Sequence, residues 1–332
     1  MGWRGMLRSL QASSRQAERS AYRRRRVLEK QRQQMERMEE FERVRYEVEL
    51  YENQMELLVS VHKECGNDWD WERVRTAKPP ERPDRDDYHE RRAQRELDRY
   101  TPSIWDKLFG KTESKTEELE QAVEDGKAKD KKEYRRAMDE YDEERVDWEQ
   151  SSQFAERIMA FDKRAYAEAL EETDPFSDLR ILGSSIRFAF PNGDVVVADI
   201  VVNGEQVIPS VIKTQLKNGT LSVKPMPKTR FYDIYQDYVC GGVLRVAREL
   251  FALLPVKTVI VTALGEVLNT STGHVEERAV LSVAIPWRTA RKIRWEEVDP
   301  SDTMANFVHR MCFKKSKGLF AVEPIRVSEL SV

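Results

Sequence analysis

The sequence predicts an α+β protein, with a helical N-terminal half and a compact C-terminal domain. Between Lys228 and Pro255, apolar residues recur every three or four positions, which is the period of one helix face. Strand-like runs with Asn-Gly turns lie on both sides of this segment. Residues 14–62, in contrast, contain no Pro or Gly and consist mainly of strong helix formers. We therefore expect helices first, followed by a mixed domain built around one central helix.

Changes in composition divide the chain into three parts. Residues 1–14 form a basic tail, and residues 15–172 form a helical region with coiled-coil character. That region contains an excursion, residues 65–111, which is rich in Pro and Trp. The α+β domain spans residues 176–325.

The helical region is expected to form a long antiparallel hairpin. Its first helix should pack back against two later helices at 115–150 and 153–172, with a short helix at 88–100 between them. The apolar residues of the first helix step by three and four, which is typical of a coiled-coil seam that mediates self-association. This seam consists of Phe41, Val44, Val48, Tyr51, Met55 and Leu58. Trp69 and Trp71 should dock the excursion onto a neighbouring helix.

The expected order of elements in the C-terminal domain is β-β-β-β-α-β-β-α. The central helix contains Gly241 and Gly242, each of which should cost about 0.8–1 kcal/mol relative to alanine. We therefore expect this part of the helix to pack closely against a sheet. The strands are expected at 185–190, 195–202, 207–214, 221–224, 256–268 and 279–285, and the last helix at 300–311.

The net charge of -3 conceals two blocks of opposite sign. Residues 1–32 hold ten Lys and Arg against two Glu, whereas residues 112–149 hold fifteen Asp and Glu against eight Lys and Arg. The basic block favours pairing with the acidic helix around 140–149, in this chain or in another copy. Binding to nucleic-acid phosphates is the alternative. The candidate binding residues are Arg23, Arg24, Arg25, Arg26, Lys30 and Arg32.

Several classes of protein are disfavoured by what the sequence lacks. The three scattered cysteines do not form a disulfide framework, so we expect a cytoplasmic protein. No run approaches 18 apolar residues, so we expect no membrane span. The phosphate-binding glycine motifs of nucleotide enzymes do not occur either.

Metal and nucleophile motifs are weak. The pairs His62-x-x-Cys65 and His309-x-x-Cys312 have the composition of a zinc site. They are far apart in the sequence, however, and free cysteines commonly behave as small hydrophobic residues, so we predict no metal site. The turn that holds Ser271, Thr272 and His274 lacks the Gly-x-Ser-x-Gly signature of a hydrolase.

One resemblance points to an enzyme class. Hairpin strands, a long helix and a further strand, with Tyr235, Gln236 and Tyr238 on the helix, resemble the core of the restriction-endonuclease-like PD-(D/E)XK family. The resemblance implies carboxylates that hold Mg²⁺ beside a lysine. No acid stands two positions before either candidate lysine, so the family's second motif is missing. The residues implied by the resemblance are Asp194, Asp199, Glu205, Lys213, Lys224 and Gln236.

Two functional interpretations therefore remain. The first is a non-enzymatic interaction or adaptor protein without a cofactor, whose helical arm oligomerises or docks onto a protein partner. The second is a protein that binds or processes nucleic acid through a degenerate nuclease-like domain, with Mg²⁺ as its cofactor.

Overall fold

The structure is a computed structural model that describes residues 40–102, 112–177, 185–268 and 271–330. Contacts divide these residues into two units, one of residues 73–153 and one of residues 40–72 with 154–330. This division differs from the expected boundary, because residues 40–72 group with the α+β domain. The basic tail 1–14, the candidate residues Arg23, Arg24, Arg25, Arg26, Lys30 and Arg32, and the side chain of Phe41 lie outside the described residues.

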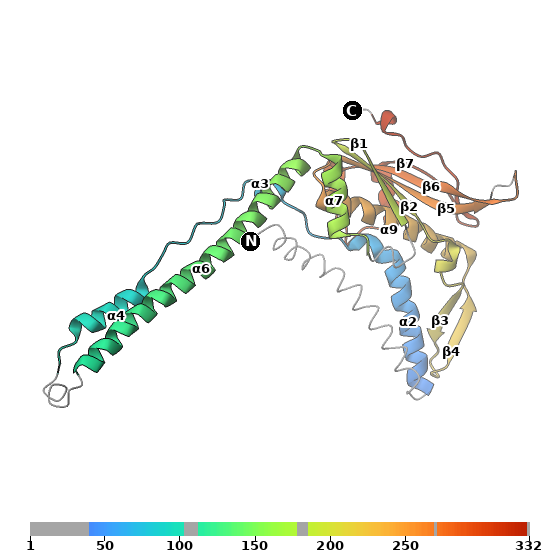
Figure 1. Cartoon of the computed structure of the whole chain (residues 1–332). Coiled ribbons are helices and arrows are strands. Elements are labelled where there is room, and N and C mark those ends of the chain that lie inside the picture. Colours follow the sequence, from blue (N-terminus) through green and yellow to red (C-terminus); the bar gives the residue numbers. More distant parts are fainter. Residues whose placement is uncertain (1–39, 103–111, 178–184, 269–270, 331–332) are drawn as a thin grey trace. The chain divides into compact units, whose positions relative to one another are not determined.

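The unit of residues 73–153 is built on α6 (Thr112–Met159), which continues beyond this unit, and on α4 (Tyr88–Arg99). These helices lie side by side (Figure 1), and an extended segment leads into α4 from α3 (Trp71–Arg75). Trp148 Nε1 donates to the Ala77 carbonyl at 2.7 Å, which holds this segment along α6. Among the described residues of the unit, the buried ones are Val74, Val123, Gly126, Asp130 and Ser151. Polar contacts therefore carry much of the packing.

The expected break between helices at 150–153 is wrong. α6 continues to Met159, and Ser151 Oγ donates to the Asp147 carbonyl inside the helix, so serine does not interrupt it here. The chain turns instead at Phe161, which has a φ of 59°. Asp162 then caps α7 (Lys163–Thr173) by accepting from the Arg164 backbone N–H at 2.9 Å.

A six-stranded sheet forms the centre of the second unit, in the order β1-β2-β5-β6-β7-β8. β2 and β5 run parallel, and the other neighbours pair antiparallel. The chain passes from β2 to β5 through a separate β3–β4 hairpin and the long helix α9 (Figure 1). The bounds are β1 (Ser185–Asn192), β2 (Val195–Val201), β3 (Val211–Gln215), β4 (Leu221–Pro225), α9 (Lys228–Leu253), β5 (Thr258–Leu268), β6 (Val275–Pro286), β7 (Val308–Lys314) and β8 (Gly318–Phe320).

The core lies on both faces of this sheet. On one face, α9 packs against β2 and β5 and buries the positions that the sequence period identified. A Cβ atom at Gly242 would meet Ile200 of β2 at 3.9 Å, and one at Gly241 would meet the turn at Val61–His62 at 3.8 Å. On the other face, Ile325 packs with Val195 and other strand residues in a separate hydrophobic cluster. The α+β class is confirmed.

The expected helix at 300–311 is wrong. Only α11 (Pro300–Thr303) and a 3₁₀ turn (Met304–Asn306) form there, and the chain then enters β7. Pairing with a neighbouring strand decides the structure here: β7 pairs antiparallel with β6, with Met311 opposite Leu281. The two extra strands β7 and β8 extend the sheet beyond the expected order.

The helix α2 (Glu40–Ser60) packs against other elements of its own unit. It contacts α9 and β3, and two seam residues, Tyr51 and Leu58, are buried at 7% and 5% exposure. Val44, Val48 and Met55 are half-buried. The apolar face that resembled a coiled-coil seam is therefore used, at least in part, inside the chain. In the described ranges, no helix is both long and apolar enough to span a membrane.

The segment after α2 is attached to α9, as Trp69 and Trp71 predicted. The Trp69 backbone N–H donates to Ala252 O at 2.7 Å, and Trp71 Nε1 donates to Leu253 O at 2.6 Å. Glu249 on α9 accepts from the Gly66 backbone N–H at 2.9 Å and pairs with Arg245 at 2.8 Å. The Arg245 and Glu249 side chains are 4% and 6% exposed, so this attachment includes a buried ion pair.

Candidate functional site

A groove in the second unit is the candidate functional site. Its cavity of about 610 Å³ lies between α2 on one side and β3 with the preceding 3₁₀ turn η2 (Glu205–Val207) on the other. A volume of this size is within the range of ligand-binding pockets. The lining residues are Glu47, Leu50, Tyr51, Gln54, Leu57, Gln206, Val207, Pro209, Val211 and Lys213.

Helix and strand periods explain why these residues share one groove. Positions 47, 50, 54 and 57 follow each other at three- and four-residue steps on α2, so they lie on one helix face. Val211 and Lys213 are two positions apart on β3, so they lie on one face of the hairpin. Five aliphatic residues supply the apolar walls, and two glutamines supply amide groups.

The charges of the groove neutralise each other. Lys213 Nζ lies 2.7 Å from Glu47 Oε1, and both side chains are 31% exposed. Solvent weakens such a pair, so its contribution to stability is modest. Among the described lining residues, Lys213 is the one cation and Glu47 the one anion, so their pairing leaves the lining without net charge.

Tyr51 is the one lining residue whose polar group is buried without a partner. Its side chain is 7% exposed, and no hydrogen-bond partner for its hydroxyl is present in the part of the chain that the structure describes. Burial raises the pKa of Tyr51, Arg230 lowers it and Glu52 raises it, and the net shift is upward. The hydroxyl therefore stays protonated at neutral pH and can donate a hydrogen bond. A buried donor without an acceptor costs free energy, which a ligand can recover by supplying the acceptor.

The residues implied by the nuclease resemblance are dispersed over different elements. Asp194 immediately precedes β2 of the large sheet and Asp199 lies within β2. Lys213 and Lys224 lie on the separate hairpin. Asp194 pairs with Lys257 at 2.8 Å. Among the described residues, no hydrogen bond or ion pair joins these acids to either lysine. Such a site would require β2 to pair with the strand that carries the lysine, but β2 and the β3–β4 hairpin belong to separate sheets.

Glu205 and Gln236 do not complete that constellation either. Glu205 begins η2, where burial raises its pKa. Gln236 on α9 places Nε2 3.7 Å from Met311 Sδ. Its amide thus contacts β7 of the sheet.

The two His/Cys pairs do not form a metal cluster in the described part of the chain. His62 is 1% exposed, and its Nε2 lies 3.1 Å from Val298 O. Burial, with the charge of Glu249 as a smaller cause, raises the pKa of Cys65 to about 12, so the thiol stays protonated. Cys312 is exposed on β7, and the His309 ring bonds to the Phe307 carbonyl.

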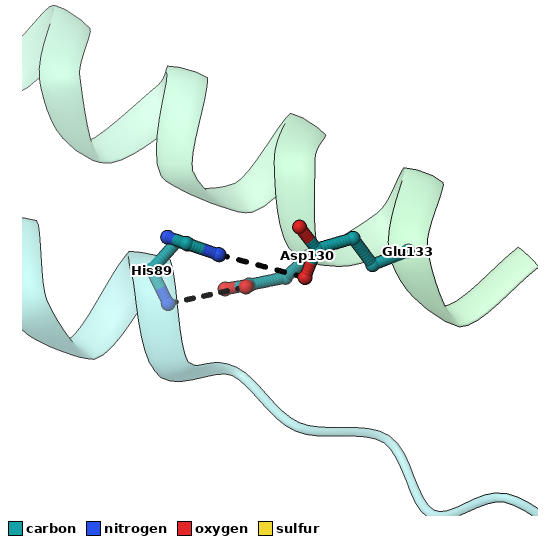
Figure 2. A group of neighbouring side chains, drawn as sticks. All are labelled: His89, Asp130 and Glu133. Carbon is teal, nitrogen blue, oxygen red and sulfur yellow. Dashed lines mark hydrogen bonds and ion pairs between the residues drawn. The ribbon is translucent and has the colours of Figure 1, made fainter. Parts of the chain in front are cut away.

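A cluster of three side chains between α4 and α6 was not predicted from the sequence. His89, Asp130 and Glu133 bring one nitrogen and two carboxylate groups together (Figure 2). Asp130 and Glu133 have the i, i+3 spacing of one helix face, but His89 is 41 positions away from Asp130 in the sequence. Only the packing of the two helices brings the three together, so no local motif could have identified them.

Two groove residues are predicted from the sequence in other roles, Tyr51 in the coiled-coil seam and Lys213 in the nuclease resemblance. The hydrophobic period of α2 is the local signal that points to this face of the helix. Their grouping with Gln206 and Pro209 depends on how α2 packs against β3. Comparisons of the chain with models of protein families, with curated proteins and with solved structures found no match.

Proposed function

We propose that this chain is a non-enzymatic interaction protein whose groove between α2 and β3 binds a short peptide segment of a protein partner. The observation that carries the proposal is the buried Tyr51 hydroxyl, a donor without an acceptor in a groove with apolar walls. The hydroxyl is closed to solvent in the free protein, so a peptide carbonyl supplies the acceptor once the Tyr51 ring turns toward the groove, and apolar side chains of the same peptide fill the walls.

The chemistry of the lining favours a peptide over a phosphate-containing ligand. Gln54 and Gln206 offer amide donors and acceptors, which match the N–H and C=O groups of a peptide backbone. A phosphate needs cations, but the only cation in the lining is Lys213, which is paired with Glu47. Among the described residues that line the groove, a nucleic acid would therefore find no unpaired cation.

Docking of a partner is favoured here over self-association through the seam of α2. The seam residue Leu58 is buried in the chain's own unit and does not line the groove, so a second copy could reach it only after α2 had left its neighbours. The groove face of α2, in contrast, is open: Gln54 is exposed, and Leu50 and Leu57 are half-buried.

Peptide selection on the full chain tests the proposal. A displayed random-peptide library is selected on the wild-type protein, and each recovered peptide is measured against two variants. Gln54→Trp places a large ring in the groove, whereas Glu56→Trp places the same ring on an exposed position outside it. We expect peptides rich in apolar side chains whose binding is lost with Gln54→Trp and kept with Glu56→Trp. Peptides that bind both variants equally would refute the groove as the site.

Tyr51→Phe separates the role of the hydroxyl from that of the ring. The free protein should keep or gain stability, because the hydroxyl has no partner to lose among the described residues. Peptide affinity should fall about threefold to tenfold, which corresponds to one hydrogen bond of roughly 0.7–1.4 kcal/mol. Unchanged affinity in this variant would remove the observation on which the proposal depends.

A further inference from the structure

The helix α4 is held on α6 with little help from apolar packing. None of its residues is buried, and at 12 residues it is near the length below which an isolated helix is marginal in water. Its N-cap residue, Asp87, makes no capping hydrogen bond through its side chain. Specific polar contacts must therefore stabilise α4 in its position.

One of these contacts is a cap that α6 provides. Asp130 is 2% exposed, and its carboxylate accepts from the backbone N–H of His89 at 3.1 Å and from that of Glu90 at 2.8 Å. The Asp130 carboxylate, an anion at neutral pH like any aspartate with hydrogen-bond donors, thus replaces the cap that Asp87 does not provide. This cap explains Asp130, but it does not explain why His89 and Glu133 converge on the same point.

The side chains of His89 and Glu133 complete a set of three possible metal ligands beside this anion (Figure 2). One ligand atom from each residue lies within 4.8 Å of the other two, and His89 Nε2 is 3.5 Å from Glu133 Oε2. Each carboxylate oxygen has two lone pairs, so the oxygens of Asp130 can accept an N–H and still bind a cation. The His89 and Glu133 side chains are 25% and 60% exposed, which leaves the cluster open to solvent.

We propose that His89, Asp130 and Glu133 bind a divalent transition-metal ion, with zinc as the best fit, and that water fills its open coordination positions. One imidazole nitrogen and two carboxylate oxygens are ligands that zinc accepts at about 2.0–2.2 Å. Two such ligands around a tetrahedral ion are about 3.4 Å apart, and His89 Nε2 and Glu133 Oε2, at 3.5 Å, already have this separation. Mg²⁺ and Ca²⁺ fit less well, because they prefer oxygen ligands alone.

The consequence of binding is a clip between the two helices. Because His89 belongs to α4 and the two acids belong to α6, the ion binds only while α4 is docked. This inference concerns the unit of residues 73–153 alone, so it stands or falls independently of the peptide groove.

Zinc titration of the full chain, first freed of metal by chelation, tests the site. Calorimetry should show one ion per chain, and Co²⁺ should give the visible absorption of a bound ion. His89→Gln and Glu133→Gln should each weaken Zn²⁺ binding about tenfold or more, while the Asp130 cap stays in place. His274→Gln and Glu143→Gln are the matched controls, since they remove a histidine and an exposed α6 acid elsewhere. Excess Mg²⁺ should not displace the zinc.

Hydrogen exchange provides a second measurement that does not depend on affinity. Zn²⁺ should slow amide exchange across residues 88–99 in the wild type and in both control variants, and should have no such effect in His89→Gln or Glu133→Gln. Zinc binding that the two ligand variants retain, or protection of α4 that they share with the wild type, would overturn the site. Absence of zinc binding in the wild type would leave the cluster as a helix cap with an adjacent ion pair, and would equally overturn it.

Discussion

Gly126 on α6 lies against the backbone of His89 on α4. A Cβ atom at position 126 would come within 2.9 Å of the carbonyl carbon and oxygen of His89, a separation that real Cβ atoms essentially never show. Because the neighbour is backbone, one of the two helices would have to shift. A glycine in the middle of a long helix is thus explained by the close approach of a second helix.

Gly126→Ala should therefore loosen α4, although alanine favours α6 itself by about 1 kcal/mol. We expect faster amide exchange in residues 88–99, with unchanged or slower exchange in α6. Ala122→Gly, at an exposed position of the same helix, is the control and should speed exchange in α6. Slower exchange in α4 of the Gly126→Ala protein would contradict the close contact.

Gly242 on α9 should behave in the opposite way. The nearest atom to a new Cβ there is Ile200 Cδ1 at 3.9 Å, an ordinary van der Waals distance. Gly242→Ala should thus raise the free energy of unfolding by about 1 kcal/mol through helix propensity. Gly242→Leu extends further toward Ile200 and should cost about 1–3 kcal/mol by overpacking. Thermal melts decide both signs, and a lower melting temperature for Gly242→Ala would show that the space is absent.

Removing only one partner of the buried Arg245–Glu249 pair should cost more stability than removing both. Arg245→Met leaves the buried Glu249 carboxylate without its cation at 2.8 Å and should lower the free energy of unfolding by about 3–5 kcal/mol. Arg245→Met with Glu249→Met should lose less, because the Glu249 charge is removed as well. The double variant still removes the cation 3.9 Å from Glu64 and the acceptor of the Gly66 N–H, so it stays below the wild type in stability. Urea unfolding measures both.

The exposed pair Arg136–Glu140 on α6 is a matched control for that experiment, since it has the same i, i+4 spacing. Arg136→Met should cost at most about 0.5 kcal/mol, because solvent screens the pair. If both arginine variants lost similar stability, burial would not be the reason for the strength of the Arg245 pair.

Asp237 on α9 should make stability depend on pH. Burial, with the nearby Asp299, Asp233 and Asp302, raises its pKa from the ordinary 3.8 to about 6, although a hydrogen bond to Ser301 opposes the shift. The folded protein therefore holds a proton that the unfolded chain releases at lower pH. Ionisation of Asp237 therefore costs more free energy in the folded protein than in the unfolded chain. The free energy of unfolding falls for this reason as the pH rises from about 4 to 6.

Asp237→Asn removes that charge without changing the shape of the side chain. We expect it to stabilise the protein by about 1–2 kcal/mol above pH 6, after allowing for solvent at a half-buried site, and to give no gain near pH 4. Unfolding measurements between pH 4 and 7.5 test this, with the exposed Asp139→Asn as control. A gain that is the same at both ends of the range would contradict the assigned pKa.

Local signals predicted much of the secondary structure. The apolar period of residues 228–255 identified α9, and the Asn-Gly turns placed β1, β2, β3 and β4 close to their observed bounds. The expected helix at 300–311 shows the limit of these signals, because pairing with β6 makes the residues from Val308 onward a strand. The single helix α6 shows the same limit, because the two serines at 151 and 152 carry no strong preference of their own.

The sequence by itself therefore determined most of the helices and strands and which of their faces are apolar, since these properties follow from the order of side chains along the backbone. It did not determine what each apolar face contacts. The face of α2 fits a coiled coil as well as it fits α9 and β3, because hydrophobic burial has no direction. The groove around Tyr51 and the cluster of His89 with Asp130 and Glu133 join residues that are distant in the chain, so only tertiary packing decided that they exist.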